Sequence, residues 1–160
     1  MSTSLAFTYQ NYMSIEKEIN QKHFSSEFQK STINLIYTYN WINEKMKEIL
    51  NRFEITSQQF NILRILRGAG EPLSTLQIRQ RMLDKMSDTS RIVDRMVIKG
   101  LVKKVVRTSD KRLVDVSLAE KGEILLGKMD QFQGEMDSIL KNLTEEEART
   151  LNSLLDKIRM

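Results

Sequence analysis

The change of hydrophobic period at Gly100 is the feature of this sequence that most constrains its fold. Before Gly100, apolar residues recur at the spacing of amphipathic helices. After it this period is lost, and in residues 114–118 apolar Val114, Val116 and Leu118 alternate with polar residues, as in a strand. Residues 101–106 and 114–118 are therefore predicted to form two strands. The polar residues 107–112 between them predict the basic tip of a β-hairpin. We expect a mainly α chain with one small β-hairpin.

Breaks and capping residues mark the expected helices. Residues 25–52 contain neither Gly nor Pro and carry apolar side chains near helical spacing, so they predict one long helix. Capping boxes, a Ser or Thr followed three positions later by Gln or Glu, predict helix starts at Thr56, Ser74 and Thr144. The other expected boundaries are helix ends near Arg67 and Leu83, a helix from Ser87 or Asp88 to Gly100, and a helix from Glu120 to about Lys141.

Composition excludes several classes of function. A chain of 160 residues suits one main core with helical extensions. The chain has no Cys and one His, His23, which we expect to be solvated, so no metal or cofactor is predicted. It has no membrane-length apolar run and no signal-like N-terminus, which favours the cytoplasm. Because no phosphate loop, paired-carboxylate motif or nucleophile system occurs, we do not expect an enzyme.

Positive charge is concentrated in one part of the chain. The net charge is only +4, but residues 79–112 contain eleven Lys or Arg against four Asp. This segment alone therefore exceeds the net charge of the whole chain, and the remainder is mildly acidic. Such a zone predicts binding to a polyanion, and the alternative is an ordinary solvated charged face.

The order helix, turn, helix and basic hairpin predicts a winged helix-turn-helix domain, whose second helix enters the major groove of DNA. The helix that ends at Gly100 would be this recognition helix, with one face packed and the other polar. Ile98 falls outward, in the last turn, where we expect it to pack under the hairpin. The packed face holds Ile92, Val93, Met96 and Val97, and the polar face holds Ser87, Asp88, Arg91, Asp94 and Arg95.

Arg91 is the main candidate for reading a base. Its guanidinium can donate two parallel hydrogen bonds to guanine O6 and N7, and Ser87 and Ser90 can bond base edges or phosphates. The alternative places Arg91 in surface ion pairs with Asp88 and Asp94, each three residues away. In the hairpin, basic residues are expected to contact phosphates or the minor groove, although a hairpin tip can also be polar simply because it is solvated. These hairpin residues are Lys103, Lys104, Arg107, Lys111 and Arg112.

Residues 86–122, MSDTSRIVDRMVIKGLVKKVVRTSDKRLVDVSLAEKG, resemble the recognition helix and wing of the MarR family of bacterial regulators. Asp110, Arg112, Val116 and Leu118 match the wing signature D-x-R-x-x-x-V-x-L-T of that family. The resemblance implies that Arg112, at the tip of the wing, contacts the minor groove of DNA and that Asp110 orders the tip. The expected DNA-binding residues are then Ser87, Asp88, Ser90, Arg91, Arg95, Lys103, Lys104, Arg107, Asp110, Lys111 and Arg112.

The resemblance also implies a domain organisation and a function. It implies a homodimeric transcription regulator, in the first place a repressor with activation left open, that binds a pseudo-palindromic operator in double-stranded DNA. A winged-helix protein-interaction module without DNA binding is the alternative, and the basic residues on both the helix and the wing argue against it. The expected divisions are an N-terminal extension, 1–24; a dimerisation helix, 25–54; the winged helix-turn-helix DNA-binding domain, 55–118; and C-terminal dimerisation helices, 119–160.

Two departures from the family pattern matter. Ala119 stands where the signature has Thr, so the following helix lacks its usual N-cap hydroxyl. The absence of Cys separates the chain from the peroxide-sensing branch and, with the single His, disfavours a metal-sensing repressor. A small aromatic ligand remains open, because relatives bind such compounds near the dimer helices. Tyr37, Tyr39 and Trp41 lie on the helix concerned, although core or dimer-interface roles are the alternative.

Overall fold

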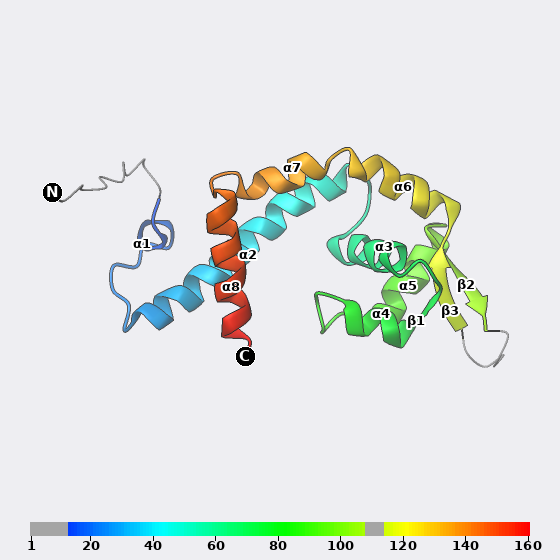
Figure 1. Cartoon of the computed structure of the whole chain (residues 1–160), viewed down its shortest axis with the longest axis horizontal. Coiled ribbons are helices and arrows are strands. Elements are labelled where there is room, and N and C mark those ends of the chain that lie inside the picture. Colours follow the sequence, from blue (N-terminus) through cyan, green and yellow to red (C-terminus); the bar gives the residue numbers. More distant parts are fainter. Residues whose placement is uncertain (1–12, 108–113) are drawn as a thin grey trace. The chain divides into compact units, whose positions relative to one another are not determined.

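The computed structural model describes residues 13–107 and 114–160, and it is mainly helical with one small sheet (Figure 1). The chain divides into two compact units, Met1–Asn43 and Glu44–Met160, with the boundary inside helix α2. No helix in the described ranges is long and apolar enough to cross a membrane. The helices and strands are α1 (Ile15–Glu18), α2 (Glu27–Asn51), α3 (Ser57–Ala69), β1 (Leu73–Ser74), α4 (Thr75–Arg81), α5 (Thr89–Ile98), β2 (Val102–Val106), β3 (Val114–Leu118), α6 (Glu120–Asp130), α7 (Gln133–Asp137), the 3-10 helix η1 (Ser138–Leu140) and α8 (Glu145–Ile158).

The N-terminal unit contains α1 and most of α2. The side chain of Ile15 is buried, and the Nζ of Lys30 lies 2.5 Å from the Oε1 of Glu16. The ammonium of Lys30 lowers the pKa of Glu16 from its ordinary 4.5 to about 2. The hydroxyl of Tyr37 donates a hydrogen bond of 2.8 Å to Glu18. Helix α1, which the sequence pattern did not predict, is thus tied to α2 by two polar contacts.

The predicted helix starts are confirmed by the capping geometry. Thr56, Ser74 and Thr144 each accept a hydrogen bond from the backbone of the residue three positions later, whose side chain returns to the cap. Asp88 caps α5, and Gly100 follows that helix with a φ of +71°. A positive φ strains residues other than Gly, so Gly100 allows the chain to leave α5 at this point. As expected, Ala119 offers no side-chain hydrogen bond to the start of α6.

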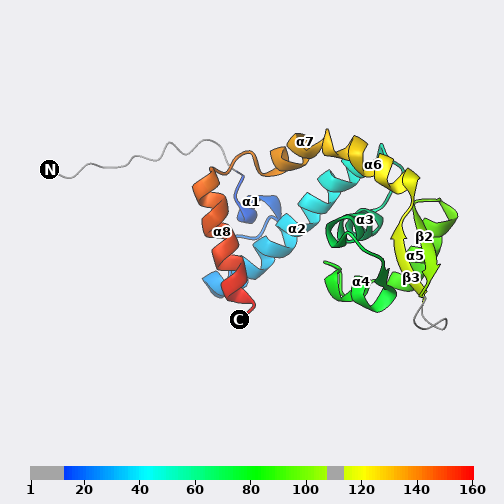
Figure 2. The ribbon, with the colours of Figure 1, turned by 45° about the vertical axis from the view of Figure 1, so that its right-hand side comes forward.

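The three-stranded antiparallel sheet has the order β1-β3-β2. The predicted hairpin of β2 and β3 is present, with Val102 opposite Leu118 and Val106 opposite Val114. The sequence did not predict β1, whose Leu73 lies opposite Val116 on the other edge of β3. In both Figure 1 and Figure 2 the hairpin projects from the group formed by α3, α4 and α5. The sheet therefore joins the helix-turn-helix to its wing.

The core of the winged domain is formed by apolar side chains from every element of that domain. Burial of one such side chain stabilises the fold by roughly 1.5 to 3 kcal/mol, so this core fixes how the helices lie on the sheet. Gly122 of α6 lies against the backbone of Leu101, where an added Cβ would approach the Leu101 carbonyl oxygen to 2.2 Å. The fully buried side chains include Ile62, Leu63, Leu73, Ile78, Met82, Val93, Met96, Val102, Val116 and Leu126.

One predicted helix is wrong in its extent. The sequence pattern predicted a continuous helix from Glu120 to about Lys141, but α6 ends at Asp130 and α7 and η1 follow as separate short turns. The break falls beside Phe132, whose ring packs edge-on against Phe53 with centroids 5.2 Å apart. The guanidinium of Arg52 lies over the same ring, 5.3 Å from its centroid. These tertiary contacts hold Phe132 outside helical geometry, which the local pattern could not reveal.

Candidate nucleic-acid interface

Helix α5 has the two faces that the sequence predicted. Val93 and Met96 are buried in the core, and Ile92 and Val97 pack against it. The side chains of Ser90, Arg91, Asp94 and Arg95 are exposed. A helix held by one apolar face in this way presents its polar face as a fixed surface, which is what recognition of DNA in the major groove requires.

A tight turn fixes the entrance to α5. The hydroxyl of Ser87 donates a hydrogen bond of 2.6 Å to Asp84, and the backbone amide of Met86 donates one of 3.0 Å to the same carboxylate. Both bonds favour the ionised form and lower the pKa of Asp84. The role of Asp84 was not predicted from the sequence, although an Asp two residues before a backbone donor is a common turn signal. Ser87, expected to contact DNA, is thus also part of this turn.

The structure agrees in part with each of the two interpretations of Arg91, the base contact and the surface ion pair. Its Nε lies 3.7 Å from Asp88, but both side chains are largely exposed, at 79% and 60%. Asp94 does not pair with Arg91; it accepts a hydrogen bond of 2.7 Å from Lys104 of β2. An ion pair this exposed contributes at most about 1 kcal/mol, so it does not prevent Arg91 from reaching a base. The base-reading role of Arg91 stays a prediction.

The expected position of Ile98 is wrong. We predicted that it would pack under the hairpin, but its side chain is 85% exposed and lies outside the core. Gly100 and Leu101 turn the chain directly into β2, so the hairpin does not fold over the last turn of α5 on that side.

Some basic side chains of the hairpin are exposed, and others are engaged in ion pairs. The side chain of Lys103 is exposed on β2, and Lys104 pairs with Asp94 as described above. The guanidinium of Arg107 donates two hydrogen bonds, of 2.7 and 2.9 Å, to the carboxylate of Asp115. The other predicted hairpin residues, Asp110, Lys111 and Arg112, lie outside the described residues.

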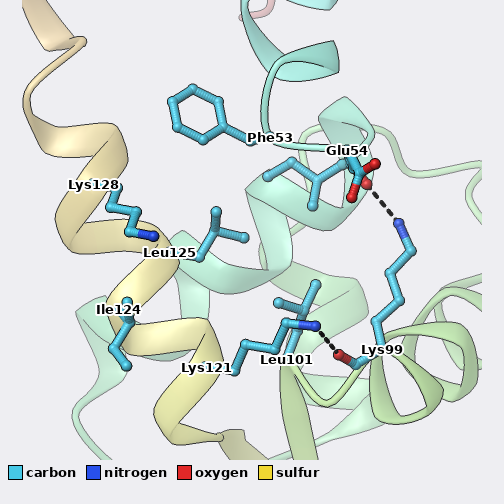
Figure 3. Close-up of a pocket in the computed structure, with 9 residues that line it drawn as sticks. Phe53, Glu54, Lys99, Leu101, Lys121, Ile124, Leu125 and Lys128 are labelled. Atoms are coloured by element: carbon cyan, nitrogen blue, oxygen red, sulfur yellow. Dashed lines mark hydrogen bonds between the residues drawn. The ribbon is translucent and has the colours of Figure 1, made fainter.

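A pocket of about 240 Å³ lies where α2 ends, α5 ends and α6 begins (Figure 3). The Nζ of Lys99 donates a hydrogen bond of 2.6 Å to the backbone carbonyl of Glu54, and the Nζ of Lys121 donates one of 3.0 Å to the carbonyl of Lys99. These two lysines therefore tie α6 to the end of α5, and the end of α5 to the end of α2. The lining consists of apolar Phe53, Ile55, Leu101, Ile124 and Leu125 and charged Glu54, Lys99, Lys121 and Lys128.

The aromatic residues singled out on α2 do not line this pocket. Tyr37, Tyr39 and Trp41 are exposed, and the hydroxyl of Tyr37 is engaged by Glu18. Over residues 13–107 and 114–160, no cluster of three or more His, Asp or Glu side chains is arranged to hold a metal ion.

Comparison with known proteins identifies the family. The sequence pattern of the MarR family matches residues 55–114, which span α3 to the start of β3. The chain is 30% identical over 123 residues to the multiple antibiotic resistance protein MarR of Salmonella typhimurium, covering 73% of this chain and 85% of the relative.

Solved structures agree with this fold. The crystal structure of a mutant MarR from Escherichia coli complexed with operator DNA superposes with a TM-score of 0.75 at 25% identity, covering 86% of this chain and 99% of that one. The organohalide-sensing regulator RdhR in its 2,4-dichlorophenol-bound form shares the fold, with a TM-score of 0.77 at 20% identity over 98% of this chain and 88% of that one. The chain therefore belongs to the MarR family of winged helix-turn-helix transcription regulators.

Proposed function

We propose that this chain is a homodimeric repressor that binds a pseudo-palindromic operator through α5 and the β2-β3 hairpin. The observation that carries the proposal is the exposed polar face of α5, fixed by its buried opposite face and joined to Lys104 of β2 through Asp94. The relative in complex with operator DNA supports the same use of the fold. Since bacterial chromosomal DNA lies in the cytoplasm, we assign the activity to that compartment.

The proposed DNA contacts divide by kind. Arg91 reads a base edge, and Ser90 and Arg95, which are exposed on the same helix, bind base edges or phosphates. Lys103 and Lys104 bind phosphates along β2. Ser87 and Asp88 hold the entrance of α5 and approach the DNA there. Lys111 and Arg112, with Asp110 ordering the tip, complete the proposed wing contact.

A salt titration tests DNA binding against the protein-interaction alternative. Genomic fragments retained by the purified protein would be sequenced to obtain the operator, and its affinity would be compared with that of a scrambled duplex by fluorescence anisotropy. If each protomer neutralises about 3 to 5 phosphates, log K falls with log salt at a slope of order −5 to −9. A slope near zero, with equal affinity for both duplexes, would overturn DNA binding and favour a protein-interaction module.

The dimerisation part of the proposal rests on exposed apolar side chains. Phe28 and Ile36 on α2, and Leu154 and Ile158 on α8, are exposed in the single chain. Burial at roughly 25 cal/mol per Å² favours association through such surfaces. Sedimentation at micromolar concentration should give a dimer. L154E should shift it toward monomer, whereas L76E, which alters a similarly exposed leucine on α4, should not; a monomeric wild-type chain would contradict the proposal.

Ligand control is the second part of the proposal. The pocket in Figure 3 combines apolar walls with three lysines and one glutamate, so it suits a small compound with an apolar body and an acidic group. Benzoate is a suitable probe. We expect it to raise the melting temperature of the wild type, with a smaller rise for K128E in α6 and an unchanged rise for the control K141E. Equal rises for all three proteins would exclude this pocket.

A further inference from the structure

The ion pair of Arg107 and Asp115 joins the two strands of the hairpin. Arg107 directly follows β2, and Asp115 is the second residue of β3. Nε of Arg107 lies 2.9 Å from Oδ2, and its terminal nitrogen lies 2.7 Å from Oδ1, so the guanidinium binds both carboxylate oxygens. This two-point geometry fixes orientation as well as distance, because a planar guanidinium and a planar carboxylate must lie side by side.

Asp115 is unusually buried for an acidic residue in a hairpin. Its side chain is only 12% exposed, whereas that of Arg107 is 36% exposed. In the sheet it lies between Val105 on β2 and Ser74 on β1, so strands flank it on both sides. Sequence alternation placed Asp115 on the polar face of β3, and the register instead encloses its carboxylate. A carboxylate withdrawn from water in this way requires a partner, and Arg107 lowers its pKa by hydrogen bonding.

The geometry points to a role for Arg107 that differs from direct DNA contact: we propose that Arg107 is a positioning residue, held by Asp115, that fixes the two strand ends of the wing. The inference rests on the proposed function, since it concerns the wing as a DNA-binding element. The pair with Asp115 uses Nε and one terminal nitrogen of Arg107, so the side chain is held against β3 even though other N–H groups of the guanidinium stay unused by this pair. Only the carboxylate of this pair is enclosed, and without Arg107 it would lose the two hydrogen bonds that offset its withdrawal from water, so we expect the pair to stay closed when DNA binds.

The substitution D115N distinguishes a direct DNA contact from a positioning role, because the two roles predict opposite changes in operator affinity. If Arg107 were a direct contact, D115N would release it and remove a negative charge from the wing, so binding would tighten. If Arg107 acts through Asp115, D115N breaks the two-point geometry, and operator binding weakens by about 10-fold, as loss of a charge-assisted pair predicts. We expect weakening.

Two further variants test whether charge or geometry matters at residue 107. R107K keeps the positive charge but cannot bind both carboxylate oxygens in a plane, so we expect it to weaken binding as much as R107A. A direct phosphate contact would instead leave R107K close to the wild type. The double variant R107M/D115L removes both charges and fills the same space with apolar atoms, as buried ion pairs often tolerate. We expect it to restore most of the operator affinity, although it lacks Arg107.

The salt dependence distinguishes positioning from phosphate contact once more. R107A should leave the slope of log K against log salt unchanged, whereas K103A, the matched control on β2, should reduce it by about 0.9 for each phosphate that the variant no longer neutralises. A reduced slope for R107A, tighter binding by D115N, or no rescue by R107M/D115L would each overturn the inference.

A measurement without DNA keeps the inference separate from the proposed function. Amide hydrogen exchange of the free protein should quicken at Val106 and Val114 in D115N and R107K, because the strand ends separate. R107M/D115L should exchange at close to the wild-type rate. Unchanged exchange in the single variants would refute the positioning role whatever the DNA titrations show. Failure of wild-type DNA binding, by contrast, would refute the proposed function alone.

Discussion

Asp94 on α5 and Lys104 on β2 are joined by an ion pair in which Nζ and Oδ1 lie 2.7 Å apart. The two residues are ten positions apart in the sequence, and each is about half exposed. The pair therefore connects the helix proposed to enter the major groove with the strand proposed to follow the backbone. It also neutralises the carboxylate of Asp94, which would otherwise repel DNA phosphates.

This pair predicts that D94N will tighten binding to DNA of any sequence. The substitution removes a negative charge that repels phosphates, and it frees Lys104 from the ion pair that its proposed phosphate contact must otherwise break. Fluorescence anisotropy on operator and scrambled duplexes measures the change in affinity. D130N is the matched control, since Asp130 pairs with Arg67; it should leave binding nearly unchanged. Weakening on the operator alone would mean that Asp94 accepts a hydrogen bond from a base.

Removal of the Arg91 side chain should reduce specificity. R91A should cost about 1 to 3 kcal/mol on the operator and far less on scrambled DNA, because a base contact carries sequence information and a phosphate contact does not. Binding isotherms on both duplexes at one salt concentration give the ratio, and a thermal melt checks the fold. If the melting temperature falls markedly while the ratio is unchanged, Arg91 serves the ion pair with Asp88 instead.

Two glycines of α6 should respond to alanine in opposite ways. G122A places a Cβ 2.2 Å from the carbonyl oxygen of Leu101, so the helix must shift away from the recognition helix and the protein should lose at least about 1 to 3 kcal/mol of stability. G127A meets nothing within 4 Å and should gain up to about 1 kcal/mol from helix propensity. Denaturant unfolding measures both. An unaffected G122A would show that α6 does not pack against Leu101 in solution.

The ion pair of Glu16 and Lys30 should make the N-terminal unit sensitive to acid. The pKa of Glu16 is lowered from 4.5 to about 2, so its stabilising effect is complete above its ordinary pKa and disappears as the pH falls toward 2. Hydrogen exchange at residues 15–19, compared between wild type and E16Q, isolates this group from other carboxylates. The difference between the proteins should be largest above pH 5 and vanish near pH 2. A difference that does not change with pH would contradict the pairing.

Local signals were sufficient for much of the fold. The caps Thr56, Ser74 and Thr144 and the packed face of α5 were predicted because each depends on residues within one or two helical turns. The two strands of the hairpin followed from the loss of the helical period after Gly100 and from the alternation in residues 114–118. The polar residues proposed for DNA binding could be identified for the same reason, since their exposure follows from the face that packs.

The features that the sequence did not reveal depend on distant contacts. Strand β1 has only two residues, too few for a period, and it exists because β3 pairs with it. The break after α6 depends on Phe132 meeting Phe53, a residue from another part of the chain. The burial of Asp115 likewise depends on its sheet neighbours. In each case the deciding partner lies far away in the sequence.

Ser74 belongs to two elements at once. Its backbone lies opposite Asp115 in the sheet, while its hydroxyl accepts the hydrogen bond that starts α4. One residue therefore links β3 to the first turn of α4, so we expect a displacement of β3 at Asp115 to disturb the start of that helix as well. We expect β3 and α4 to keep their relative positions when the protein binds DNA. Mutations that alter the preferred spacing of half-sites should therefore map outside residues 55–118.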